Sequence, residues 1–242
     1  DYALKDRLHV VLDVHGVLNK RNSRDVFSDP SLRPWYSHMS GKYRYFYSNN
    51  SSQRRQYAAF NPRMGMVFNA VKHKDIQLFA NISRSYEPPT FDELVGTEVT
   101  SNINTSPKKL FSIGLEKQTA TTFEVGSKGR LRQLSWNVAY YHSWVNHEIL
   151  EVKDYVRGLQ RTENYPHTLH QGLEIGVQAA SKPHFFGRNI GTFTLGAVYD
   201  YSRFIFKGGK YDGKYLAGIP KHYVNASLDY RHSSGLNGSV AL

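Results

Sequence analysis

The feature of this chain that most constrains its fold is a two-residue alternation of apolar and polar side chains over unusually long segments. Leu8, Val10 and Leu12 share one face of residues 8–18. His9 and Asp13 lie on the other face. The alternation returns in residues 56–71, 76–86, 121–129, 133–152, 168–181, 191–204 and 222–232. Successive side chains of a strand point to opposite faces, so the pattern predicts β-strands of about 10 residues or more, longer than the ~5–6 usual in soluble sheets.

The breaks between these segments alternate in length. Short turns are expected at residues 72–75, 129–132, 182–189 and 233–238. Long loops are expected at residues 19–55, 87–119, 153–163 and 206–220. Long strands with short turns at one end and long loops at the other are typical of antiparallel transmembrane β-barrels. The spacing predicts an all-β chain with eight complete strands and the start of a ninth, with the turns on the periplasmic side and the loops outside.

A soluble β-sandwich or propeller would also show alternation. Loops as long as residues 19–55 argue against a small sandwich, where long structureless connections are uncommon. The second face of the strands is also polar, as Gln77, Asn81 and Ser83 illustrate. A sandwich would have to pack that face against a second sheet, so we favour the barrel.

Composition removes several other classes of protein. The net charge is +11, but the basic residues are scattered and form no Lys/Arg block of the kind that binds nucleic acid, so we expect no nucleic-acid partner. The chain has no cysteine, which excludes disulfides and thiolate chemistry within it. No apolar run approaches the roughly 18 residues of a membrane helix.

Motifs for catalysis or metal binding are also missing from the sequence. No G-x-S-x-G elbow occurs, and no spacing of Ser, His and Asp selects a triad, so we predict that the protein is not an enzyme. The 11 histidines show no zinc spacing. His9 and His15 would share the inner face of a strand, but at a separation of roughly 20 Å, which is too far for one ion.

Four segments resemble a known family: "FNPRMGMVF" (60–68), "LFANISRSYEPPTFDEL" (78–94), "TATTFEVGSKG" (119–129) and "LAGIPKHYVNASLDY" (216–230). In this order they resemble TonB-dependent outer-membrane receptors of the siderophore-receptor type. The resemblance implies a barrel of about 22 strands filled by an N-terminal plug domain. Residues 1–242 would then be part of that barrel, without the plug and the last strands. With two unpaired edges, such a piece is not expected to insert alone.

The resemblance also implies a function and partners. It implies TonB-energised uptake of a ferric siderophore across the outer membrane of a Gram-negative bacterium. The iron would arrive inside its chelator, so no cofactor is expected on this chain. The implied partners are TonB–ExbB–ExbD through the plug, the outer membrane and lipopolysaccharide. Heme, cobalamin, or a copper or zinc complex are alternative cargoes, and a passive porin or adhesin is the alternative class.

Candidate ligand-binding residues lie in the first long loop and at one strand exit. Cations beside aromatic rings suit a flat anionic ligand, because the rings stack and the cations neutralise its charge. The loop candidates are Arg33, Trp35, Tyr36, His38, Tyr43, Arg44 and Tyr45, and the exit candidates are Arg84, Tyr86 and Glu87. Alternatively, the aromatic residues form an interfacial girdle, where Tyr86 would also belong by its height.

The strand exit itself has a predicted geometry. Pro88 and Pro89 cannot donate ladder hydrogen bonds, so the chain is expected to leave the sheet there. Thr90 is a predicted N-cap for a short helical turn that carries Asp92 and Glu93. These prolines could simply set the direction in which the loop departs.

Overall fold

The computed structural model describes residues 2–4, 7–24, 35–37, 43–45, 47–48, 52–71, 75–99, 108–154, 159–185 and 188–242. The long strands are β2 (Leu8–Ser23), β6 (Gln53–Asn69), β7 (Ile76–Glu87), β10 (Gln118–Leu131), β11 (Leu134–Asp154), β12 (Leu159–Ala180), β15 (Thr192–Phe206) and β16 (His222–Arg231). The short strands are β1 (Tyr2–Leu4), β3 (Trp35–Ser37), β4 (Tyr43–Tyr45), β5 (Tyr47–Ser48), β8 (Val95–Val99), β9 (Lys108–Ser112), β13 (His184–Phe185), β14 (Arg188–Asn189) and β17 (Asn237–Ala241). A 3-10 turn, η2, spans Gly209–Tyr211.

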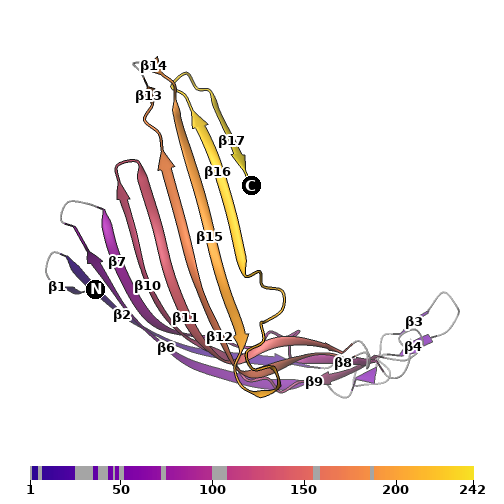
Figure 1. The fold of residues 1–242 in the computed structure, drawn as a ribbon. Helices are drawn as coiled ribbons and strands as arrows, with labels where there is room; N and C mark the ends of the chain where they lie inside the picture. The colour runs from indigo at the N-terminus through magenta and orange to yellow at the C-terminus, as the bar shows by residue number, and fades with distance from the viewer. Residues whose placement is uncertain are drawn as a thin grey trace.

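The long strands form one curved antiparallel sheet (Figure 1). Its path runs β1-β2-β6-β7-β10-β11-β12-β15-β16-β17, so strands adjacent in sequence are adjacent in space. Eight long strands and the shorter β17 confirm the predicted all-β organisation. The sequence did not predict β1, which pairs with β2 from Tyr2↔Val10 to Leu4↔Leu8. Figure 1 shows β1 and β17 at the two edges of the trough-shaped sheet.

Connections at one end of the sheet are short, as predicted. Strands β10 and β11 are joined across Arg132 and Gln133, and Arg132 has a φ of 55° that suits a tight hairpin. At the other end, the predicted loop over 153–163 is too long, and residues 155–158 of it lie outside the described residues. Strands β11 and β12 stay paired as far as Asp154↔Leu159, because the ladder continues beyond the apolar segments on which the prediction rested.

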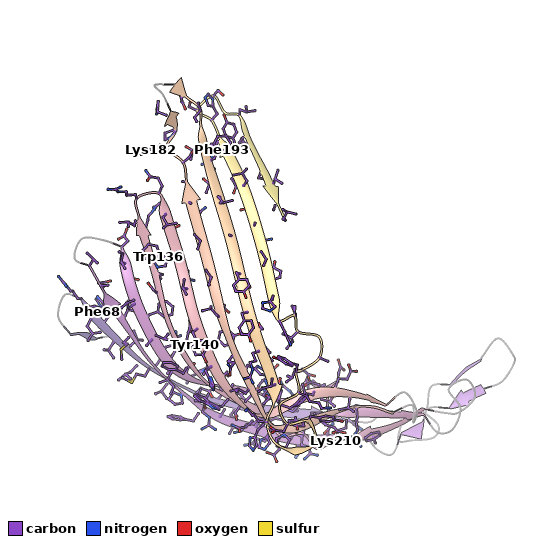
Figure 2. All side chains as sticks on the ribbon, viewed as in Figure 1. Phe68, Trp136, Tyr140, Lys182, Phe193 and Lys210 are labelled. Atoms are coloured by element: carbon purple, nitrogen blue, oxygen red, sulfur yellow. The ribbon has the colours of Figure 1, made fainter. Side chains whose placement is uncertain are left out.

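Apolar side chains cover the outer face of the sheet. Leu12, Val14 and Phe60 have 70%, 60% and 62% of their surface exposed, which would be unfavourable in water but suits hydrocarbon. Phe68, Trp136 and Phe193 lie towards the turn end (Figure 2), where an aromatic girdle is expected. The opposite, inner face is polar: the register places Asp13 beside Arg63 and Arg63 beside Ser83.

The pairing between β6 and β7 covers only part of their length. Among the described residues it extends from Asn69↔Gln77 to Arg63↔Ser83 and stops there. Even-numbered residues of β6 direct their backbone groups towards β7, since the Ala70 N–H donates to the Ile76 carbonyl and the direction alternates along a strand. Pro62 is the next even residue and has no N–H to donate. The ladder therefore ends at the position where its next donor is missing.

Candidate functional site

The predicted loop residues lie beyond the sheet. Trp35 and Tyr36 are in β3, and Tyr43, Arg44 and Tyr45 are in β4. The two strands form a small hairpin with the pairs Trp35↔Tyr45 and Tyr36↔Arg44. Figure 1 shows this hairpin past the loop end of the sheet. Arg33 and His38 lie outside the described residues, so the role of this loop in ligand binding stays a prediction.

A polar cavity of about 590 Å³ lies on the inner face near the predicted strand exit. We call it the inner cavity; its lining residues are Asp13, His15, Val17, Asn61, Arg63, Asn81, Ser83, Arg84, Ser85, Tyr86 and Glu124. Four strands supply them, because β2, β6, β7 and β10 are consecutive in the sheet and turn their polar positions to the same side.

The inner cavity carries charges of both signs. Asp13 faces Arg63 across the β2–β6 ladder. Asn81 Nδ2 donates to a carboxylate oxygen of Glu124 at 2.8 Å. Arginine can bind carboxylate or catecholate oxygens of a ligand, and carboxylates can accept from its hydroxyl or amine groups. The arrangement thus suits a polar chelate that presents several oxygen atoms.

The structure brings two of the three predicted exit residues into this cavity. Arg84 and Tyr86 line it, whereas Glu87 ends β7 opposite Gln118 and does not. The Tyr86 hydroxyl accepts a hydrogen bond from the Asn19 side chain. Asn19 belongs to the inner face of β2, so the expected place of Tyr86 in an outward aromatic girdle is wrong. Strand β7 separates from β6 just below Tyr86, and this lets its side chain turn inward.

The chain after Glu87 folds back onto the sheet. We call the described residues between β7 and β10, which are 88–99 and 108–117, the rim. Pro89 is almost completely buried, and its carbonyl accepts from Arg21 Nε at 3.3 Å. The Thr90 hydroxyl accepts from the Glu93 N–H at 3.3 Å, and a Glu93 carboxylate oxygen accepts from the Thr90 N–H at 2.7 Å. This is a capping box, which confirms Thr90 as a cap, although the segment forms a turn and then enters β8 rather than a helix.

The rim is held to β6 by buried contacts. Leu94 is fully buried, and its carbonyl accepts from Gln53 Nε2 at 2.9 Å. The Tyr57 hydroxyl donates to the carbonyl of Leu115, which is also buried. The loop between β7 and β10 is thus anchored at both of its ends against the loop end of β6.

Sequence reasoning missed a second inner-face cluster, formed by Glu148, Thr168 and His170. Glu148 is 7% exposed; its carboxylate accepts from the Thr168 hydroxyl and lies 3.2 Å from His170 Nε2. The His170 ring stacks on Phe204 with centroids 4.2 Å apart. Glu148 reaches this face at the one interruption of the β11–β12 ladder, between Asn146↔His167 and Glu148↔Tyr165, where His147 has a left-handed φ of 54°. Histidine in a left-handed backbone has no sequence signature, so no motif could have revealed it.

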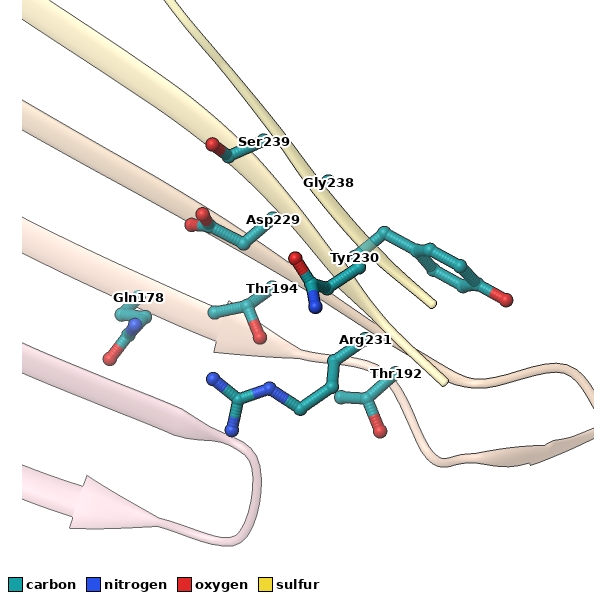
Figure 3. A pocket seen from close by; sticks show the side chains of 9 residues that line it. Gln178, Thr192, Thr194, Asp229, Tyr230, Arg231, Gly238 and Ser239 are labelled. Carbon is teal, nitrogen blue, oxygen red and sulfur yellow. The ribbon is translucent and has the colours of Figure 1, made fainter. Parts of the chain in front are cut away.

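A further cavity, of about 730 Å³, lies at the turn end near the edge strand β17. In Figure 3 the side chains of Gln178, Thr194, Asp229 and Arg231 project from one side of the sheet, and Tyr230 points away. This cavity lies far along the strands from the rim. Within the described part of the chain, no group of three or more His, Asp or Glu side chains could hold a metal ion.

No helix in the described residues is both long and apolar enough to cross a membrane. No curated protein matches the sequence. The family model for the β-barrel of TonB-dependent receptor-like proteins matches residues 7–240.

Solved structures with a similar fold include receptors and transporters. The ferric yersiniabactin uptake receptor FyuA of Yersinia pestis is 11% identical with a TM-score of 0.62, over 94% of this chain and 29% of that one. The copper transporter OprC is 13% identical with a TM-score of 0.64, over 94% and 30%. The alcaligin outer-membrane receptor FauA of Bordetella pertussis is 14% identical with a TM-score of 0.56, over 99% and 35%.

At these identities the structural similarity concerns the fold, and this chain spans about a third of the length of each neighbour. The family match covers nearly all of the sequence. Members of this family are transport receptors of the Gram-negative outer membrane and not enzymes. The sheet described above, with its apolar outer face and polar inner face, therefore belongs to the β-barrel of a TonB-dependent receptor.

Proposed function

We propose that the protein containing this chain takes up a metal chelate, specifically a ferric siderophore, in a process energised through TonB. The observation that carries this proposal is the inner cavity: a polar, mixed-charge pocket directly inside the rim of a receptor barrel. A chelate that enters past the rim would meet Arg84 and Tyr86 first and Arg63 deeper in. Arginine fits the carboxylate or catecholate oxygens of a siderophore in a bidentate manner.

Growth under iron starvation tests the cargo. A strain lacking the gene is expected to lose growth on one ferric siderophore of a panel and to regain it when the complete receptor is restored. Loss of tonB should abolish the same growth, whereas a passive porin would not need it. Unchanged growth on every ferric chelate, combined with lost uptake of a copper complex, heme or cobalamin, would replace the siderophore by that cargo.

A single substitution tests the cavity. In the complete receptor, Arg63→Ala is expected to weaken chelate binding about tenfold, since one charge-assisted hydrogen bond is worth roughly 1.4 kcal/mol or more. Lys182→Ala, an exposed cation at the turn end, is the matched control. Normal binding by the Arg63 variant would show that the chelate binds elsewhere. The growth experiment would still identify the cargo.

A further inference from the structure

The wall of the barrel has a gap between β6 and β7. Beyond the last pair, Arg63↔Ser83, a cavity of about 460 Å³ separates the two strands. Its lining residues are Ala58, Ala59, Phe60, Asn61, Arg84, Lys117 and Thr119. Phe60 points to the outer face and Asn61 to the inner face, so the cavity passes through the wall. It shares Asn61 and Arg84 with the inner cavity.

The gap has the chemistry of an anion site. Arg84 and Lys117 border it, and the described residues that line it include no carboxylate. The Lys117 ammonium donates to the Ala58 carbonyl, and a lysine has two further N–H groups to donate. The backbone N–H groups of Ala58 and Phe60 also point into the gap, by the alternation that places Pro62 towards β7.

A second observation indicates that a polar group belongs in the gap. The Oδ1 atom of Asn61 is buried and has no hydrogen-bond partner among the described residues. A buried acceptor without a partner is costly, by about 1–3 kcal/mol. Asn61 and Thr119, which is itself 9% exposed, both belong to the lining of the gap. A polar occupant of the gap would lie beside these two polar side chains.

The gap lies at the outer boundary of the apolar band. The outward apolar positions end at Leu18 in β2, Phe60 in β6 and Ile82 in β7. The next charged positions on the same side are Lys20, Arg54 and Arg84, all exposed. Lipid phosphates lie at this level in a membrane, directly beyond the hydrocarbon.

We propose that the gap between β6 and β7 binds the phosphate of an outer-leaflet lipid headgroup, with Arg84 and Lys117 as its cationic ligands. A lipid reaches the gap from the membrane side, where its phosphate is already at the right height. A water-borne chelate would have to displace lipid headgroups to enter from that side.

Lipid A carrying its two phosphates is a suitable probe, with binding to the purified complete receptor measured by native mass spectrometry. The double variant Arg84→Gln/Lys117→Gln is expected to bind it at least tenfold more weakly. Its matched control is Lys128→Gln/Arg130→Gln, which removes two cations near the turn end of β10 and should bind normally. A heat-modifiable band on gels verifies that each variant folds.

A second variant tests the width of the gap separately from its positive charge. Pro62→Val restores a ladder donor, narrows the gap and should weaken lipid A binding without removing a cation. Normal binding by either the double variant or Pro62→Val would overturn the proposal, and so would equal binding of dephosphorylated lipid A. Displacement by inorganic phosphate at equal concentration would assign the gap to a free anion and overturn the lipid source. Chelate uptake in the same variants is a separate readout, so failure here leaves the proposed function standing.

Discussion

Two strand junctions of the same sheet each contain a proline, and they behave differently. In β6, Pro62 faces β7 and the ladder ends there. In β12, Pro166 faces β11, yet the ladder resumes on the far side with Glu148↔Tyr165 and continues to Asp154↔Leu159. The direction of Pro166 follows from the Ala180 N–H, which donates to the Gln133 carbonyl of the β11 side.

The difference lies in a side chain that replaces the missing donor. At the β11–β12 junction, Asn164 Nδ2 donates to the His147 carbonyl at 2.8 Å, which is the acceptor that a residue with an N–H at 166 would serve. Asn164 also accepts from the Glu116 N–H at 2.7 Å and donates to the Glu116 carbonyl at 3.0 Å. At the β6–β7 junction the Lys117 ammonium bonds the Ala58 carbonyl, four residues beyond Pro62, and does not rejoin the strands.

A proline in a membrane strand is therefore not by itself a break. Its effect depends on whether a neighbouring polar side chain satisfies the orphaned carbonyl, since hydrocarbon offers no water to do so. The satisfied junction is continuous and carries the buried Glu148 cluster. The junction at Pro62 is open and lies beside the inner cavity.

The largest expected effect comes from removing the replacement donor. Asn164→Ala should lower the free energy of unfolding of the complete barrel by roughly 2–4 kcal/mol, because it deletes three hydrogen bonds at one site. Urea denaturation in liposomes followed by tryptophan fluorescence measures this. Adding Pro166→Ala to that variant supplies a backbone N–H and should recover part of the loss. A double variant no more stable than Asn164→Ala would contradict the role assigned to Pro166.

Two glycines of β12 test how closely this strand packs against its neighbours β11 and β15. A Cβ at Gly172 would lie 2.5 Å from both the Tyr141 hydroxyl and the Tyr201 carbonyl, whereas one at Gly176 would meet only the Asn137 carbonyl, at 3.8 Å. Gly172→Ala should therefore destabilise the barrel by about 1–3 kcal/mol. Gly176→Ala, four residues along the same face, should have little effect in the same denaturation assay.

Closing the open junction between β6 and β7 should raise the free energy of unfolding, by less than the two preceding variants lower it. Pro62→Val provides the missing N–H for β7 and is expected to raise stability by about 0.5–1.5 kcal/mol. Hydrogen exchange should detect a newly protected amide at position 62. Pro166→Ala alone is the comparison, because Asn164 already serves that acceptor and little gain is expected. An unprotected amide at 62 would mean that another constraint keeps β6 and β7 apart.

The smallest effect concerns the rim above the open junction. Thr90→Ala removes one half of the capping box and should cost about 0.5–1 kcal/mol locally, with no change in the global unfolding midpoint. Faster hydrogen exchange at Glu93, whose N–H donates to Thr90, would report the change. Thr90→Ser retains the hydroxyl and should exchange like the natural protein.

Much of the fold was predictable because it depends on local pattern. Alternation over residues 8–18 assigned His9 and Asp13 to the inner face, and the alternating break lengths separated turns from loops. Thr90 and Glu93 signalled a cap through their spacing alone. The loop predicted over 153–163 was too long, because residues 153–154 and 159–163 are mostly polar and yet pair in the ladder. There, side-chain hydropathy no longer indicates strand formation.

By itself, the sequence determined that this chain forms long, two-faced strands with an apolar side for lipid and a polar side for a lumen. Side-chain chemistry at every second position suffices for that. Only the tertiary structure decided which polar residues meet: Tyr86 reaches Asn19, and Asn164 reaches His147. It also decided that Pro62 opens a junction while Pro166 does not. The reason is that register between strands, and the side chain that lies opposite a proline, are long-range properties that no local pattern encodes.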